Sequence, residues 1–242
     1  MKMTKIYEGT HQWVMFGRDE NKPDNIVDSN QYIVRTPNKC LLLQPGGTEL
    51  FAPMMAAVLH HAPVDQITDL FASHQDPDVI SSLGLWDQAL SNAKLHAPAL
   101  WEGYIRHFGC ESIEYVPIPD NGETIKIESV ELQLIPAHYL HSPCGFHVYD
   151  PVAKILMCGS VGSAFEAPNA PVFVERFDVH VEKMRYYHQR MLPSNQAKRA
   201  WIDKVRNLDI DILAPQHGRM FRGDDVKRFL DWLDSLQVGT GI

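Results

Sequence analysis

The segment Ser73-His-Gln-Asp-Pro-Asp78 gives the clearest indication of the fold. It follows a short β-capable run at residues 66–72, so its polar side chains begin where a strand is expected to end. His74, Asp76 and Asp78 are separated by one residue each, and in extended backbone alternate side chains point to the same side. Imidazole and carboxylate groups are ligands for zinc, iron and manganese. The segment therefore predicts a metal site in a loop at a strand end.

Helix capping is a simpler interpretation of the same segment. Pro77 suits the first turn of a helix, where its missing N–H costs nothing. An acidic side chain at that end, such as Asp76 or Asp78, opposes the helix dipole. On this interpretation the segment only begins the helix that we expect over residues 78–93. The choice between capping and metal binding therefore depends on the rest of the chain.

Two further segments place histidines at the ends of expected strands. His138 and His141 lie just after an alternating β-like run at residues 130–135. His217 follows another apolar run, and the glycine after it permits a positive φ angle. Taken singly, each histidine is at least as well explained by a surface position or a hydrogen bond. Three strand ends that each carry a metal-capable side chain nevertheless favour a metal site together.

The remaining pattern indicates an α/β protein. A Pro-Asn turn between residues 31–35 and 40–44 predicts a hairpin. Further strands are expected at residues 123–128, 130–135, 146–149, 154–158 and 209–214, and helices at residues 50–61, 78–93, 98–108, 179–192, 194–207 and 224–236. Strands, helices, more strands and more helices in this order suit two packed β-sheets with helices outside. We expect a single domain over residues 1–242, because no linker or repeat divides the chain.

Composition excludes several classes of function. The formal net charge is −8 with no basic stripe, which disfavours binding to nucleic acid or to an anionic membrane. Neither a signal peptide nor an apolar run of roughly 20 residues is present, so we expect a cytoplasmic protein. The four cysteines form no CxxC pair, and the glycine-rich signatures of ATP and NAD sites are absent. A metal is therefore the only cofactor that the sequence indicates.

With these positions established, the sequence resembles the metallo-β-lactamase superfamily. The residues HQDPD at 74–78 look like a reduced form of its HxHxDH or HxExDH motif, and His141, Ser160 and His217 stand at its later ligand positions. The sequence is most similar to the diiron domain of flavodiiron proteins and to the stand-alone oxygen-binding diiron proteins. The supporting segments are Asn30-Gln-Tyr-Ile-Val34, Leu140-His-Ser-Pro143, Lys154-Ile-Leu-Met157, Arg185-Tyr-Tyr-His188 and Ala214-Pro-Gln-His-Gly218. The resemblance implies a four-layer αββα sandwich with non-haem iron.

The resemblance also implies which side chains bind metal. Carried over residue by residue, His74, Asp76 and His141 form a first metal site, and the carboxylate at its second position agrees with the flavodiiron pattern. Short carboxylate ligands suit iron, which performs oxygen chemistry. Only Asp78 and His217 remain for a second ion. We therefore expect one or two ions, with the second held more weakly.

Two residues depart from the family pattern. Val79 stands where the motif has its last histidine, and Ser160 stands where a carboxylate bridges both metals. His138 is expected near the site, as a ligand or as a hydrogen-bond partner of a ligand. His138 or Tyr187 is expected to donate a hydrogen bond to bound oxygen.

Three functions are consistent with this site. The resemblance implies an iron protein that binds, senses or reduces oxygen, works as a homodimer, lacks its own flavodoxin domain and needs an external flavoprotein or rubredoxin for turnover. The second is a zinc-dependent hydrolase, in which Asp78 orients a zinc-bound hydroxide. The third is a degenerate, non-catalytic binding protein, for which restoring histidine at 79 and aspartate at 160 would create tight binding of a second metal. Whether the protein is an enzyme stays open.

Overall fold

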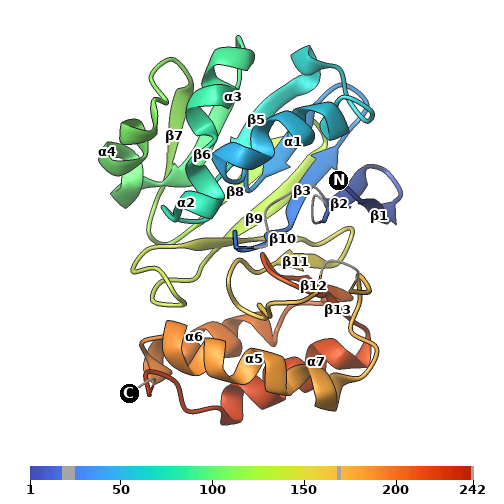
Figure 1. Cartoon of the computed structure of the whole chain (residues 1–242), viewed down its shortest axis with the longest axis vertical. Helices are drawn as coiled ribbons and strands as arrows, with labels where there is room; N and C mark the ends of the chain where they lie inside the picture. The colour runs from blue at the N-terminus through green and yellow to red at the C-terminus, as the bar shows by residue number, and fades with distance from the viewer. Residues whose placement is uncertain (18–24, 168–169, 241–242) are drawn as a thin grey trace. The chain divides into compact units, whose positions relative to one another are not determined.

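A computed structural model describes residues 1–17, 25–167 and 170–240 (Figure 1). The chain forms two compact units, Met1–Glu131 and Leu132–Ile242, called unit 1 and unit 2 below. Each unit combines β-strands with helices, as the predicted α/β class requires. This division does not test the prediction of a single domain, which stays a prediction.

Unit 1 contains a seven-stranded sheet with the order β1-β2-β3-β4-β5-β6-β7. The pairs β1–β2, β2–β3 and β3–β4 are antiparallel, whereas the pairs β4–β5, β5–β6 and β6–β7 are parallel. The predicted hairpin is confirmed as β3 and β4, in which Arg35 pairs with Cys40. The bounds are β1 Met3–Glu8, β2 Gln12–Phe16, β3 Gln31–Arg35, β4 Cys40–Leu43, β5 Ile67–Phe71, β6 Lys94–Pro98 and β7 Glu114–Ile118. At the end of the unit lie β8 (Glu123–Ile127) and the start of β9 (Val130–Pro136), which continues into unit 2.

Short helices connect the parallel strands of unit 1, as parallel pairing requires. They are η1 Thr48–Leu50, α1 Phe51–Val58, η2 Val64–Gln66, α2 Pro77–Ile80, α3 Leu83–Ala89, η3 Ala99–Trp101, α4 Glu102–Ile105 and η4 Arg106–Phe108, where η marks a 3₁₀ turn. Met54 of α1, Val79 of α2 and Trp86 of α3 are buried in one apolar cluster with Leu42 and Leu70 of the sheet. Every residue of β4 is buried, which explains its continuous apolar sequence.

Two expected helices differ from the structure. The single helix expected over residues 78–93 is interrupted at Ser81 and Ser82, so the structure has two short helices, α2 and α3, instead of one. The Ser82 hydroxyl donates to the Gly46 carbonyl oxygen at 2.8 Å, and such side-chain bonds compete with helical ones. In the expected helix at residues 98–108, Pro98 belongs to β6, and residues 99–108 are helical but consist largely of 3₁₀ turns.

The strands of unit 2 have the order β13-β12-β11-β10-β9. Strands β11 and β12 are parallel, and the other neighbours are antiparallel. The expected strands are confirmed as β10 Phe146–Asp150, β11 Ile155–Met157 and β12 Ile212–Ala214, and the structure adds β13 Phe221–Arg222. Because β11 and β12 run parallel, the segments that follow Met157 and Ala214 begin at the same edge of the sheet.

Three longer helices belong to unit 2, namely α5 (Phe177–Met191), α6 (Asn195–Val205) and α7 (Asp224–Ser235), and they form one group in Figure 1. Their apolar residues share a buried cluster with Leu156 of β11 and Leu213 of β12. Ser194 caps α6 as predicted, since its hydroxyl accepts the Ala197 N–H at 3.1 Å. Among the described residues, no helix has both the length and the apolar character that crossing a membrane requires.

Candidate metal centre

His74 lies in unit 1, shortly after β5, and is 4% exposed. Its Nδ1 is 2.6 Å from the Ser73 hydroxyl, which also accepts a 2.6 Å hydrogen bond from Gln44 Nε2. The Ser73 N–H donates in turn to Gln44 Oε1 at 3.0 Å. If Nε2 coordinates a metal, Nδ1 keeps the ring proton and donates it to Ser73. Ser73 and Gln44 therefore hold the ring in the orientation that a ligand needs.

Gln44 and Ser73 were not predicted as supports for His74. They are 29 residues apart, and no local pattern connects them. The signal lies in the topology, because β4 and β5 are parallel and Leu43 pairs with Phe71. Residues that follow two adjacent parallel strands emerge at the same edge, which brings Gln44 to Ser73.

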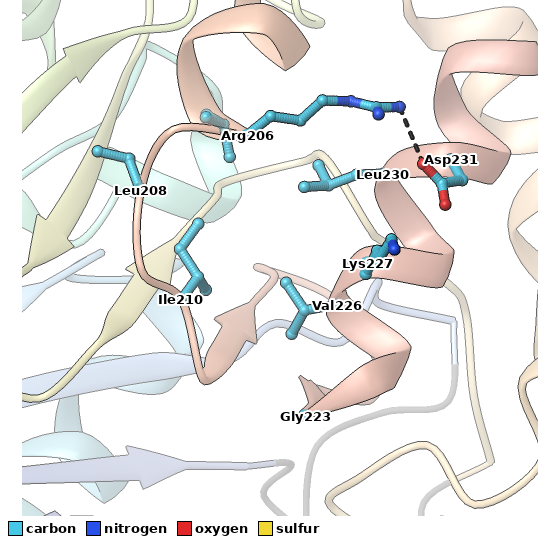
Figure 2. Close-up of a pocket in the computed structure, with 9 residues that line it drawn as sticks. Arg206, Leu208, Ile210, Gly223, Val226, Lys227, Leu230 and Asp231 are labelled. Carbon is cyan, nitrogen blue, oxygen red and sulfur yellow. Dashed lines mark ion pairs between the residues drawn. The ribbon is translucent and has the colours of Figure 1, made fainter.

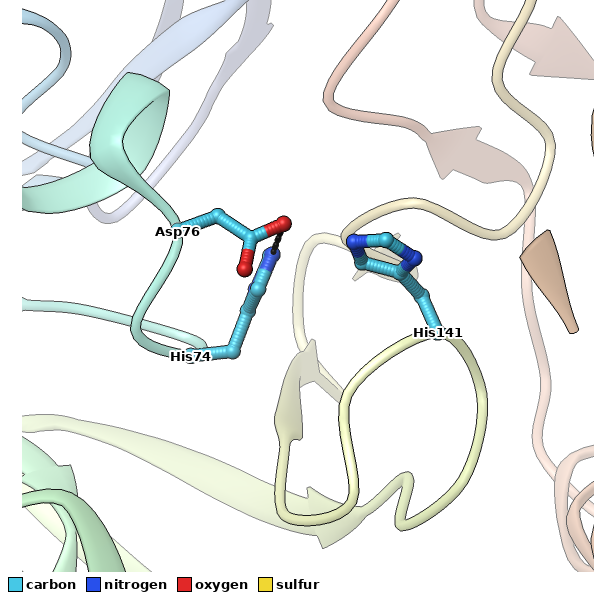
Figure 3. A group of neighbouring side chains, drawn as sticks. All are labelled: His74, Asp76 and His141. Carbon is cyan, nitrogen blue, oxygen red and sulfur yellow. Dashed lines mark ion pairs between the residues drawn. The ribbon is translucent and has the colours of Figure 1, made fainter. Parts of the chain in front are cut away.

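Asp76 lies at the start of α2, beside His74. It is the N-cap residue, but its side chain makes no capping hydrogen bond. Its Oδ2 lies instead 3.4 Å from His74 Nε2, as Figure 3 shows. Two donors that share a metal at about 2.1 Å each lie about 3 Å apart, so this spacing suits a common ion. Asp78 is half-buried in the first turn of α2, where Pro77 begins the helix and the acidic side chain opposes the helix dipole, as the capping interpretation also expects.

His141, also drawn in Figure 3, lies in unit 2 in the loop between β9 and β10. Its φ angle is 94°, and that of Tyr139 is 58°. Hydrogen bonds close the loop, from the Ala137 N–H to the Gly145 oxygen and from the Tyr139 N–H to the Ser142 oxygen, both at 2.8 Å. Such backbone conformations cost free energy for residues other than glycine and cluster at functional sites. The loop thus fixes His141 in a costly conformation.

His138 belongs to the same loop. The Gly145 N–H donates to its Nδ1 at 3.4 Å, and its ring packs edge-on against Phe146 with centroids 5.3 Å apart. Because Nδ1 is an acceptor, the neutral ring carries its proton on Nε2. This tautomer provides the N–H that the predicted hydrogen bond to a bound ligand requires, although the role itself stays a prediction.

Ser160 and His217 follow the neighbouring strands β11 and β12 of unit 2. They are 4% and 5% exposed. The Ala164 N–H donates to the His217 oxygen at 3.2 Å, which joins the two segments. Gly218 has a φ angle of 80°, and a Cβ there would clash with the carbonyl oxygen of Ala164. The positive φ angle that the sequence suggested for this glycine is therefore confirmed.

Helix α5 carries the predicted residue Tyr187. Its ring centroid lies 6.4 Å from that of His217. The preceding residue, Tyr186, is 72% exposed and belongs to the solvent-facing side of the helix. Of these two tyrosines, Tyr187 is the one that accompanies a predicted ligand.

His188 supports the Ser160 segment. It is fully buried, its Nδ1 donates to the Met184 oxygen at 2.9 Å, and its Nε2 accepts the Gly162 N–H at 2.9 Å. Burial lowers the pKa of His188 to about 4, so the ring is neutral at pH 7 and keeps the acceptor that Gly162 needs. The neutral imidazole therefore anchors the loop after β11 to α5.

A pocket of about 350 Å³ lies elsewhere in unit 2, between the end of α6 and α7 (Figure 2). Its walls are largely apolar, with an ion pair of 3.0 Å between Arg206 Nη2 and Asp231 Oδ1 at its rim. The apolar walls are Val205, Leu208, Ile210, Val226 and Leu230. None of the predicted metal ligands lines this pocket, so it has no part in the metal centre.

Comparison with known proteins identifies the family. A sequence model described as "ODP family beta lactamase" matches residues 27–218. No curated protein matches the chain. The solved structure "Peroxy diiron species of chemotaxis sensor ODP" is 33% identical, with a TM-score of 0.88, and the match covers 100% of this chain and 97% of that one.

Two further structures agree in fold. The apo state of chemotaxis sensor ODP from T. denticola is 34% identical with a TM-score of 0.86, covering 99% of this chain and 96% of that one. Rubredoxin oxygen:oxidoreductase from the anaerobe Desulfovibrio gigas is 18% identical with a TM-score of 0.85, covering 96% and 61%. The predicted metallo-β-lactamase-like fold is thereby confirmed. The chain belongs to the ODP family of β-lactamases.

Proposed function

We propose that the protein binds dioxygen at a non-haem iron centre. One observation carries this proposal, namely the 33% identity along the whole chain to the chemotaxis sensor ODP, whose structure is described as a peroxy diiron species. The match of the ODP family model to residues 27–218 agrees with this relationship. Iron is accordingly the proposed cofactor, with zinc as the alternative that metal analysis must exclude.

The proposed first iron site consists of His74, Asp76 and His141. Two imidazoles and one carboxylate are the ligand set of ferrous proteins that react with oxygen. Ferrous iron held by these residues would supply the reducing electrons for binding oxygen. Ser73 orients the His74 ring, and the strained loop holds His141.

Asp78 and His217 are proposed for a second ion, with Ser160 beside it. A serine hydroxyl is a poorer ligand than the carboxylate that it replaces, because it carries no charge. We therefore propose that the second ion binds more weakly than the first. His138 and Tyr187 are proposed as hydrogen-bond donors to bound oxygen, since each has a polar hydrogen and Tyr187 lies beside His217.

Reconstitution with ferrous iron under anaerobic conditions tests the proposed function. We expect stoichiometric iron binding, followed by a charge-transfer absorption band when oxygen is admitted. Elemental analysis of protein purified without added metal should find iron, whereas zinc would support a hydrolase. Iron-loaded protein that stays colourless and unchanged in oxygen would contradict the proposal.

Sustained oxygen reduction requires electrons, and we propose an external flavoprotein or rubredoxin as the donor for any turnover. A cytoplasmic location is part of the same proposal. Cell fractionation tests the location, and reduction of the iron-loaded protein by candidate flavoproteins or rubredoxins tests the donor.

We also propose a homodimer, in which the helical segment of residues 99–108 contacts a second copy. Leu100, Tyr104 and Phe108 are three large apolar side chains of this segment, and they are 55%, 63% and 37% exposed. One helix pair buries little area, so the dimer should be weak and dependent on concentration.

Replacing Tyr104 by glutamate should abolish this dimer, because it removes the central apolar side chain and adds like charge. Sedimentation velocity over a range of concentrations measures the effect. Tyr186→Glu is the matched control, since Tyr186 is also a strongly exposed tyrosine. A wild-type chain that is monomeric at all concentrations, or a dimer unaffected by Tyr104→Glu, would contradict this surface.

A further inference from the structure

Phe165 and Glu166 in unit 2 reverse the usual distribution of apolar and charged side chains. Phe165 is 57% exposed, whereas the adjacent Glu166 side chain is only 7% exposed. Burying a carboxylate costs free energy unless it is paired, and exposing a phenyl ring gives up the free energy of burying it. Such an inversion needs a reason, and the surroundings of the two side chains supply it.

Glu166 is held by groups from two separate elements. Its Oε2 accepts a 2.6 Å hydrogen bond from Lys183 Nζ, and its Oε1 lies 2.9 Å from Arg219 Nε and 3.2 Å from His180 Nδ1. Burial alone would raise the pKa of Glu166, but Lys183, Arg219 and His180 hold it below its ordinary value. The carboxylate is therefore ionised and ties its loop to α5 and to the segment after His217.

Phe165 is placed by this anchor against the imidazole of His217. The two ring centroids are 5.7 Å apart, and Phe165 also packs edge-on against Tyr187 at 5.4 Å. The N–H of the preceding residue, Ala164, donates a hydrogen bond to the backbone oxygen of His217. Two aromatic rings thus flank His217, and Phe165 lies between the hydrogen-bonded backbone of Ala164 and the paired side chain of Glu166.

We propose that Phe165, positioned by Glu166, is an aromatic cover over His217 that limits the access of water to this histidine and slows the release of a metal bound there. The apolar shell around a metal site controls solvent access, and a phenyl ring offers no polar atom to assist ligand exchange. The geometry of the cover is supported by the ring contacts of Phe165 with His217 and Tyr187, and it does not depend on a bound metal. Its effect on metal release rests on the proposed function, in which His217 is a ligand of the weaker ion.

Proton NMR of the metal-free protein tests the geometry. The ring current of Phe165 should shift the His217 carbon-bound protons, which are assigned from their loss in His217→Gln. Phe165→Ala and Phe165→Leu should both move these signals, and Glu166→Ala should move them in the same direction because it frees the loop. Tyr186→Ala, the control on the exposed side of α5, should leave them in place. Unchanged His217 signals in Phe165→Ala would overturn the proposal.

The rate at which iron-loaded protein releases iron to an excess of chelator tests whether Phe165 slows metal release. Phe165→Ala should release iron about 10-fold faster than wild type, the scale on which outer groups alter metal affinity. Phe165→Leu should restore slow release, since leucine is apolar and bulky but has no ring. Wild-type protein that binds no iron would contradict the proposed function, whereas wild type and Phe165→Ala that release iron at equal rates would overturn the cover alone.

Discussion

Replacing His141 by glycine is expected to weaken ferrous iron binding by more than about 100-fold, because loss of a ligand exceeds the 10- to 100-fold effect of losing an outer partner. Only His74 and Asp76 would remain in the proposed first site. Glycine is the informative substitution, since it accepts the φ angle of 94° without strain and so should not destabilise the loop. An anaerobic titration with ferrous iron measures the affinity, and urea unfolding measures the free energy of unfolding.

The control for this prediction is His107→Ala, which removes an exposed histidine that we place outside the site. We expect wild-type iron affinity in that variant. If His141→Gly also kept its affinity, His141 would not be a ligand and the proposed triad would be wrong. If affinity fell together with the free energy of unfolding, damage to the loop would account for the loss.

The sequence predicted the fold best where one local pattern was enough. The hairpin of β3 and β4 has an apolar strand on each side of a Pro-Asn turn, and its register follows from the turn. Strand β6 was missed because Lys94–Pro98 contains a lysine, a histidine and a proline. It forms because β5 and β7 supply hydrogen bonds on both sides, and this information lies far away in the chain.

The residues of the candidate site also differ in whether a local sequence pattern indicates them. His74, His141 and His217 could be proposed as ligands because a strand end followed by a short polar loop is visible in the sequence. The groups that contact them were not predicted. Ser73 is hydrogen-bonded to Gln44, which follows another strand, and Phe165 is next to Glu166, whose partners come from two distant elements. Spacing along the chain carries no signal for contacts of this kind.

Val79→His is expected to destabilise the protein by roughly 3 kcal/mol, although it restores the last histidine of the family motif. Val79 is fully buried in the apolar cluster of unit 1, and its carbonyl oxygen accepts the Gly46 N–H at 3.0 Å. An imidazole there is larger than the valine and loses its hydrogen bonds to water. Urea unfolding of the metal-free variant measures the loss, with Val79→Ile as the apolar control.

The two departures from the motif should therefore behave differently. Ser160 lies in the loop after β11, which backbone hydrogen bonds join to the segment of His217, so Ser160→Asp adds a carboxylate where the family has one, and we expect tighter binding of a second ion. Val79→His should not tighten that binding, because the side chain is part of the core. A Val79→His variant that is stable and binds a second ion tightly would show that the position opens toward the metal. We therefore propose that the packing of Val79 in the core of unit 1, together with the missing carboxylate, weakens the proposed second site.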